Sequence, residues 1–170
     1  MLFTNENIVP ESLPQLAESE ERGLEKNYLK VQLIGLGIFL AILLVPAIVL
    51  IFVEKVPAWA NILIFAVWFL ITGLSVMLTV LGFPRKKISL REKDLSYRSG
   101  LLFRSVQSVP FARVQHCEVS QGPIARIFGL ASLKVYTAGG SGSDLNVPGL
   151  LPEKAHQIKD FILQQLPDHA

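Results

Sequence analysis

The sequence has a single cysteine, Cys117, so it cannot build a disulfide framework within the chain. A lone thiol suits a reducing compartment. His116 adjoins this cysteine, and the pair suggests metal binding or thiol chemistry as one interpretation. Neighbouring side chains of a strand point to opposite faces, however, so these two are poorly placed to share a metal ion. We therefore predict a buried cysteine beside an exposed histidine, with no metal site and no cofactor.

Recognisable catalytic motifs are also lacking. Ser141 and Ser143 lie in a Gly/Ser-rich segment, residues 138–143, but nothing around them resembles a nucleophile elbow. The segment has no lysine of a phosphate-binding loop and does not lead into a helix. Turn chemistry explains it better, because glycine and serine favour tight turns. The sequence thus predicts a protein that is not an enzyme.

Charge is absent from two long apolar runs, residues 31–53 and 58–83. At about 1.5 Å per residue, each run is long enough to cross a hydrocarbon core of about 30 Å. Four residues separate the runs, so they must form an antiparallel transmembrane hairpin rather than two distant helices. Pro46 inside the first run is tolerated in a membrane helix, and Trp68 is expected to pack against the partner helix or lipid. The alternative is a soluble protein with two buried helices.

The charges that flank the hairpin predict its topology. Lys26 and Lys30 precede the first run, a basic cluster follows the second, and the connecting loop offers Lys55 alone. The positive-inside rule therefore predicts that both termini are cytoplasmic. The apolar run begins some thirty residues into the chain behind an acidic segment, so we do not expect a cleaved signal peptide.

The N-terminal tail, residues 1–30, is acidic, with six acidic residues against three basic ones. Residues 19–30 could form a short helix that runs into the membrane. We expect a solvated tail. Docking of this tail onto the basic domain is the alternative.

Residues 84–170 include twelve basic and seven acidic residues. Apolar and polar residues alternate along this region with a period of two. The alternation and the turn signals between segments predict antiparallel strands joined by hairpins. Two segments break this period: a short helical turn at residues 124–128, and an amphipathic C-terminal helix after Pro152 that is expected to cover the sheet. The expected strands are residues 88–91, 95–98, 101–109, 112–119, 132–137 and 145–147.

Five short motifs occur in order in this region: GLLFR (residues 100–104), VPFARVQ (109–115), QGPIARIFGLA (121–131), VYTAGG (135–140) and VPGL (147–150). Together with the two preceding helices, they resemble the YdbS-like bacterial membrane proteins that carry a bacterial pleckstrin-homology domain. The resemblance covers Val31 to about Leu166. It implies a mainly-β pleckstrin-homology-like fold at residues 84–170, with two antiparallel sheets and a C-terminal helix. It also implies residence in the bacterial inner (cytoplasmic) membrane.

A basic collar after the second run is the first candidate site. Cationic side chains at a membrane surface are attracted to anionic lipid headgroups, although these residues could also serve topology alone. Relatives of the fold use basic residues in the first hairpin loop for inositol lipids, but here that loop is Glu92-Lys93-Asp94, which argues against such capture. The candidate lipid contacts are Arg85, Lys86, Lys87, Arg91 and Lys93.

A second basic set and one aromatic residue form a candidate partner-binding surface. Pairing of the arginines with Glu118, or capping of the short helix, is the structural alternative. The candidates are Arg104, Arg113, Arg126, Lys134 and Tyr136.

Two functions remain open. The first is a membrane-anchored, non-catalytic interaction module that binds a protein, which the resemblance implies is another membrane protein with similar domains, or a second copy. The second is a peripheral sensor of anionic lipid headgroups that acts through the basic collar. Nucleic acid is a poor fit because the net charge is only +2 and no binding motif is present.

Overall fold

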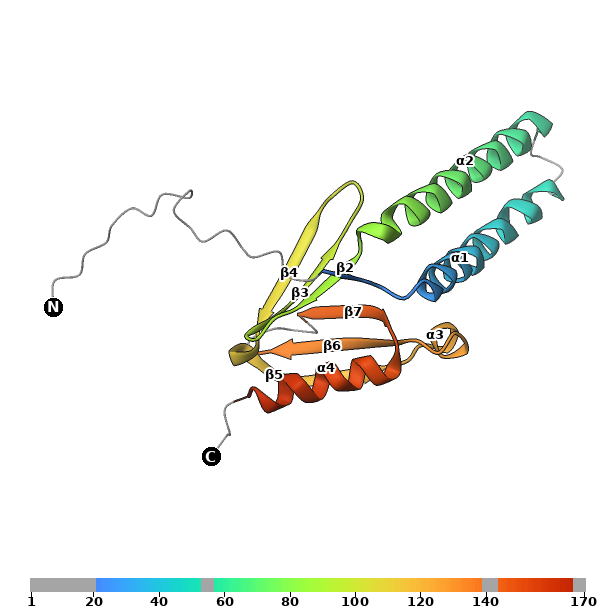
Figure 1. The fold of residues 1–170 in the computed structure, drawn as a ribbon. Coiled ribbons are helices and arrows are strands. Elements are labelled where there is room, and N and C mark those ends of the chain that lie inside the picture. The colour runs from blue at the N-terminus through green and yellow to red at the C-terminus, as the bar shows by residue number, and fades with distance from the viewer. Residues whose placement is uncertain (1–20, 53–56, 139–143, 167–170) are drawn as a thin grey trace, which may run out of the picture.

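A computed structural model of the chain describes residues 21–52, 57–138 and 144–166 (Figure 1). Two long helices, α1 (Asn27–Ile51) and α2 (Ala58–Gly82), lie side by side and project from a β domain. Both are long and apolar enough to cross a membrane. The predicted fold class, a helical hairpin followed by two antiparallel sheets and a C-terminal helix, is confirmed.

The hairpin is held by contacts between its helices, while its outer surface is apolar. The indole Nε1 of Trp68 donates a hydrogen bond to the carbonyl oxygen of Leu40 at 3.3 Å, so Trp68 packs against the partner helix. Large side chains such as Ile42 and Leu70 are mostly exposed. An exposed apolar surface of this kind is stable in contact with lipid and unfavourable in contact with water.

The first sheet has the order β1-β2-β3-β4, with antiparallel pairing throughout. Its first strand precedes the hairpin in the chain and the other three follow it. The sheet therefore joins a segment before the two membrane helices in sequence with segments after them. The strands are β1 (Arg22–Gly23), β2 (Lys87–Leu90), β3 (Asp94–Ser99) and β4 (Ser105–Pro110).

The N-terminal segment differs from its prediction. A helix was expected over residues 19–30, but within the described part the chain forms β1 and becomes helical only at Asn27. Pairing with the edge of β2 satisfies the backbone there, and the amide of Glu25 donates to the carbonyl of Gly149 at 3.2 Å. Leu24 is buried in the core. These residues thus dock onto the β domain, as the alternative interpretation held, rather than forming a solvated face.

The third predicted strand is wrong in its first half, because β4 begins at Ser105 rather than Leu101. Residues 100–104 form a tight turn in which Gly100 has φ +105°. A Cβ atom at Gly100 would lie 1.8 Å from the Phe103 carbonyl oxygen, so only glycine fits. The apolar triplet that follows Gly100 imitates a strand in sequence but belongs to the turn.

The second sheet has the order β5-β6-β7 and is also antiparallel. Burial alternates perfectly along its central strand, which is why period-two patterning predicted it well. A short 3-10 turn, η3 (Phe111–Arg113), replaces the first residues of the fourth predicted strand. The strands are β5 (Val114–Ser120), β6 (Ala131–Thr137) and β7 (Leu145–Leu150).

Two helices complete the domain. The short α3 (Pro123–Ile127) has proline in its first turn. Gly129 follows the helix, and its φ of +63° allows the closing hydrogen bond from Leu130 N to Ala125 O at 2.8 Å. The C-terminal α4 (Pro152–Gln164) packs on β5 and β6. Both agree with the predicted helical segments.

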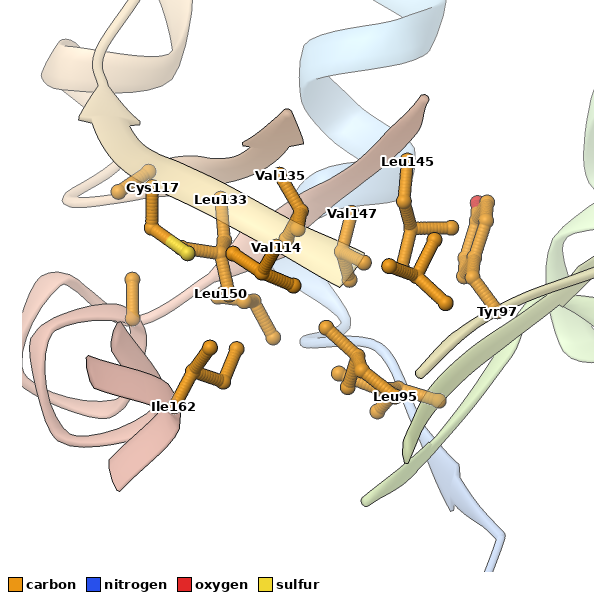
Figure 2. Packing of buried hydrophobic residues seen from close by; sticks show 14 of the residues in the cluster. Leu95, Tyr97, Val114, Cys117, Leu133, Val135, Leu145, Val147, Leu150 and Ile162 are labelled. Atoms are coloured by element: carbon orange, nitrogen blue, oxygen red, sulfur yellow. The ribbon is translucent and has the colours of Figure 1, made fainter. Parts of the chain in front are cut away.

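The core lies between the two sheets and α4 (Figure 2). Leu95 of the first sheet, Leu133 and Val147 of the second, and Ala155 and Ile162 of α4 are fully buried. Each fully buried leucine, valine or isoleucine side chain contributes about 1.5–3 kcal/mol relative to exposure. This shared core makes the two sheets and the helix one packing unit.

Candidate functional site

The junction between hairpin and β domain is built around Gly149 and Tyr28. A Cβ atom at Gly149 would lie 2.5–2.9 Å from Tyr28 side-chain carbons, so the absence of a side chain lets the start of α1 rest on β7. The ammonium of Lys86 lies 5.4 Å from the centre of the Tyr28 ring, within cation–π range. Burial lowers the pKa of Lys86. The hairpin is thus seated on the domain by packing as well as by its covalent link.

Acidic residues of the N-terminal segment pair with basic residues of the domain. Glu21 contacts Lys87 at 2.7 Å and Arg98 at 2.9 Å. The hydrogen bond from Lys87 lowers the pKa of Glu21, an effect that partial burial opposes and the charges of Arg98 and Lys87 support. Glu25 pairs with Lys154 at 2.7 Å. These ion pairs explain why an acidic segment lies on a basic domain.

The structure divides the five candidate lipid contacts into two groups. Arg85, Lys86 and Lys87 lie where α2 passes through the 3-10 turn η2 (Phe83–Arg85) into β2. Arg91 and Lys93 lie at the opposite end of β2, in the turn before β3. They do not form one collar.

Each residue of the first group has a partner within the protein. The Arg85 guanidinium donates to the carbonyl oxygen of Leu101 at 3.1 Å, and Lys87 holds Glu21. Lys86 lies over Tyr28. The residues nearest the hairpin therefore help to fix the junction.

Two of the five candidate partner-binding residues lie together on the outer face of the second sheet. Lys134 and Tyr136 alternate with the buried residues of β6, and their neighbours on β5 are Glu118 and His116. The Tyr136 hydroxyl donates to Glu118 at 3.0 Å, which raises the pKa of Tyr136, and the Lys134 ammonium lies 3.7 Å from the same carboxylate. The His116 ring stacks on Tyr136 with centres 4.2 Å apart. We call these four residues the outer-face cluster.

Half of this cluster was not predicted from the sequence. His116 and Glu118 were considered only for metal binding and for pairing with arginine, whereas they pair with Tyr136 and Lys134. The register of β5 against β6 brings them together, and a strand register cannot be read from one sequence when a bulge intervenes.

The three candidate arginines lie at three separate places. Arg113 is at the end of the second sheet remote from the hairpin, where its charge lies near Asp144. Arg104 follows the turn between β3 and β4, and Arg126 lies in α3; both places adjoin the hairpin, as described below. The predicted set therefore does not form a single surface.

The remote end of the second sheet is tied by Asp144. Its carboxylate accepts hydrogen bonds from the Thr137 amide at 2.8 Å and the Thr137 hydroxyl at 2.5 Å. The hydrogen bond from the Thr137 hydroxyl is the main cause of a lowered pKa of Asp144, and the bond from the Thr137 amide is the second. The nearby Arg113 charge adds to the effect. This is a structural tie between β6 and β7 rather than a reactive group.

A groove of about 430 Å³ lies between the first sheet and α4. Its size is that of a small-molecule pocket, and its wall combines apolar side chains with Arg22 and the ion pair between Lys154 and Glu25. None of the residues that line the groove was predicted to form a site. They include Arg22, Ile88, Leu90, Lys154, Ile158 and Phe161.

Cys117 is buried and His116 is exposed, as predicted. Burial raises the pKa of the Cys117 thiol to about 11, so the thiol is protonated at neutral pH. In the described part of the chain, no group of three or more histidine, cysteine or acidic residues could hold a metal ion.

Comparison with known proteins identifies the family. A family described as Bacterial PH domain matches residues 31–166. The transmembrane protein YdbS of Bacillus subtilis (strain 168) is 32% identical over 109 residues, which cover 62% of this chain and 65% of that protein, just under two thirds of its length. No solved structure matches. The match spans both membrane helices and the β domain, and we conclude that this membrane protein belongs to the bacterial PH-domain family.

Proposed function

We propose that the protein is a membrane-anchored interaction module that binds a protein partner through the outer-face cluster. One observation carries the proposal: His116, Glu118, Lys134 and Tyr136 form an ordered aromatic and charged patch on the outer face of the second sheet, with His116 and Glu118 exposed and Lys134 and Tyr136 partly exposed. Tyrosine is enriched at binding hot spots because it combines a large apolar ring with a polar tip.

The position of the patch supports this role. β6 begins after α3, which packs against α1, and runs away from the hairpin (Figure 1). Tyr136, near the end of β6, is therefore remote from the membrane. A second membrane protein with a domain of similar height, or a second copy of this chain, is the partner that we propose. We also propose, from the flanking charges, that both ends of the hairpin face the cytoplasm of a bacterial cell.

The lipid-sensor hypothesis has less support in its original form. A collar that reads headgroups needs its cations on one surface, whereas Arg91 and Lys93 lie at the far end of β2. Arg85 and Lys87 hold groups within the protein. Replacing Lys86, Lys87, Arg91 and Lys93 with glutamine tests it: a sensor would lose selectivity for anionic vesicles, and a binding module would keep its partner.

The proposed function is tested by crosslinking in native membranes. A photo-crosslinking residue at Gln115, beside the outer-face cluster, is expected to capture a defined protein, and the double variant His116→Ala/Tyr136→Ala is expected to abolish the capture. The matched control is His156→Ala, which removes an exposed histidine from α4 instead. Capture that survives the double variant, or fails equally in the control, would rule out this surface.

A further inference from the structure

The exposed apolar surface of the described β domain is concentrated at two tips. Among its described residues, the most exposed large hydrophobics are Phe103 (88%), Ile127 (80%) and Leu102 (73%). Leu102 and Phe103 belong to the β3–β4 turn, which we call the turn tip, and Ile127 ends α3, the helix tip. Next in exposure is Val106 on β4, close to the turn tip. Such side chains are costly to hold in water unless something covers them.

Both tips lie at the end of the domain from which the hairpin emerges. A Cβ atom at Gly82, the last residue of α2, would lie 3.6 Å from Leu101 Cβ, and Arg85 bonds the Leu101 carbonyl. Helix α3, which carries the helix tip, contacts α1. Figure 1 shows the β3–β4 turn beside the lower end of α2, and α3 beside the lower end of α1. Two segments far apart in sequence thus flank the two membrane helices at one level.

That level is the surface of the bilayer. The uncharged runs start at residue 31 and end at residue 83, so headgroups surround the first turn of α1 and the last turn of α2. Side chains beside these turns reach the headgroup and upper acyl region without any change in the fold. Because the hairpin fixes this position, the bilayer is the one partner that the tips always face.

Charge on the tips fits the same partner. Arg104 follows Phe103 directly, and Arg126 precedes Ile127; both arginines are exposed. An apolar side chain beside an arginine matches the headgroup boundary, where acyl chains take the first and phosphates bind the guanidinium. The turn tip is also pre-shaped, because Gly100 holds a backbone that other residues cannot adopt.

We propose that the turn tip and the helix tip seat the β domain on the membrane surface, with Leu102, Phe103 and Ile127 inserted at the headgroup boundary and Arg104 and Arg126 on lipid phosphates. The seat is independent of the proposed partner binding, since it uses other residues on another end of the domain. It fixes the tilt of the domain and holds it against the bilayer from both sides of the hairpin.

Site-specific fluorescence tests the proposal in the full chain. Cys117 is replaced by serine, and a single cysteine that carries an environment-sensitive dye is placed at Leu102 or Ile127, or at Glu92 in the remote turn as the control. The protein is reconstituted, one copy per disc, in lipid nanodiscs of phosphatidylcholine and phosphatidylglycerol in equal parts. We expect blue-shifted emission and quenching by lipids that carry a nitroxide in the upper acyl chain at both tips, and neither effect at Glu92.

Two further measurements separate a lipid seat from other causes. The variant Leu102→Ser/Phe103→Ser should weaken the quenching of a dye at Ile127, whereas Leu90→Ser, which changes an exposed leucine away from the tips, should leave it unchanged. Quenching at the tips no stronger than at Glu92 would overturn the proposal. A blue shift that appears only with two copies per disc would also overturn it and would assign the tips to a second copy of the chain.

Discussion

The two ends of the β domain differ in what they present. The end that faces the hairpin carries exposed apolar side chains at Phe103 and Ile127, each beside an arginine. The described part of the remote end carries the polar turn before β3 and the Thr137–Asp144 tie. Leu102, Phe103 and Ile127 lie outside the strands, so sheet alternation does not account for their exposure. Distance from the membrane therefore explains their placement better than secondary structure does.

The largest effect is expected from filling the space under Tyr28 at the hairpin-facing end. Gly149→Ala should lower the free energy of unfolding by roughly 2–5 kcal/mol, because Gly149 has φ +70° and an added Cβ overlaps Tyr28. Denaturant titration in mild detergent measures this. The control is Gly122→Ala, because a Cβ atom added at Gly122 would meet no neighbouring atom within 4 Å and the residue has φ −70°. This change should leave the free energy of unfolding nearly unchanged. Equal stabilities would mean that α1 does not rest on β7.

Cys117, in the core between the two ends, should resist alkylation. Its pKa of about 11, against an ordinary 9.0, makes the thiolate roughly a hundredfold scarcer, and burial limits access further. Mass spectrometry should show labelling at least roughly a hundredfold slower in the native protein than in urea. A cysteine placed at the exposed Gln107, with Cys117 changed to serine, should label readily. Comparable rates at the two positions would show that the core opens often.

Acid should weaken the remote end through Asp144. The folded state lowers the pKa of this carboxyl below its ordinary 3.8, so its stabilisation is present above that value and is lost as pH falls through the lower folded-state pKa. Asp144→Asn should reduce Tm at neutral pH and should flatten the further loss of Tm in acid. Asp160→Asn, an exposed change on α4, is the control. A variant that matches the wild type at every pH would show that the tie carries no stability.

The smallest effect is expected for the ion pair between the N-terminal segment and α4. Lys154→Met should cost less than about 1 kcal/mol, and less at high salt, because both partners are partly exposed, 54% and 35%. Backbone pairing of β1 and the Glu25–Gly149 hydrogen bond should keep the segment in place. Hydrogen exchange at Gly23 in the variant and in Lys159→Met measures this. Full exposure of Gly23 would show that charge, not the backbone, holds the segment.

Strong periodicity made much of the fold predictable. Two uncharged runs gave the hairpin, the alternation of β6 gave a half-buried strand, and the apolar spacing after Pro152 gave α4. Two-residue β1 has no period to detect and forms only because β2 offers an unpaired edge. The turn at residues 100–104 was missed because its leucines and phenylalanine look like a strand when read without φ angles.

The candidate sites were harder to predict because they depend on the direction in which each strand runs and on the register between strands. Lys87 and Arg91 are close in sequence, yet β2 rises about 3.3 Å per residue and carries Arg91 away from the hairpin. His116 meets Tyr136 only through the strand register. The apolar tips could not be predicted because their exposure and their position beside the membrane helices depend on the three-dimensional fold.

The β1–β2 pairing imposes an order on biosynthesis. β1 leaves the ribosome before either membrane helix, but its partner strand is made only after both, more than sixty residues later. At about 5–20 residues per second, the N-terminal segment waits roughly 3–13 s for β2. Both membrane helices are therefore synthesised before the first sheet can close. A chain whose second helix failed to insert would leave β1 and β2 on opposite sides of the bilayer, unpaired and open to degradation.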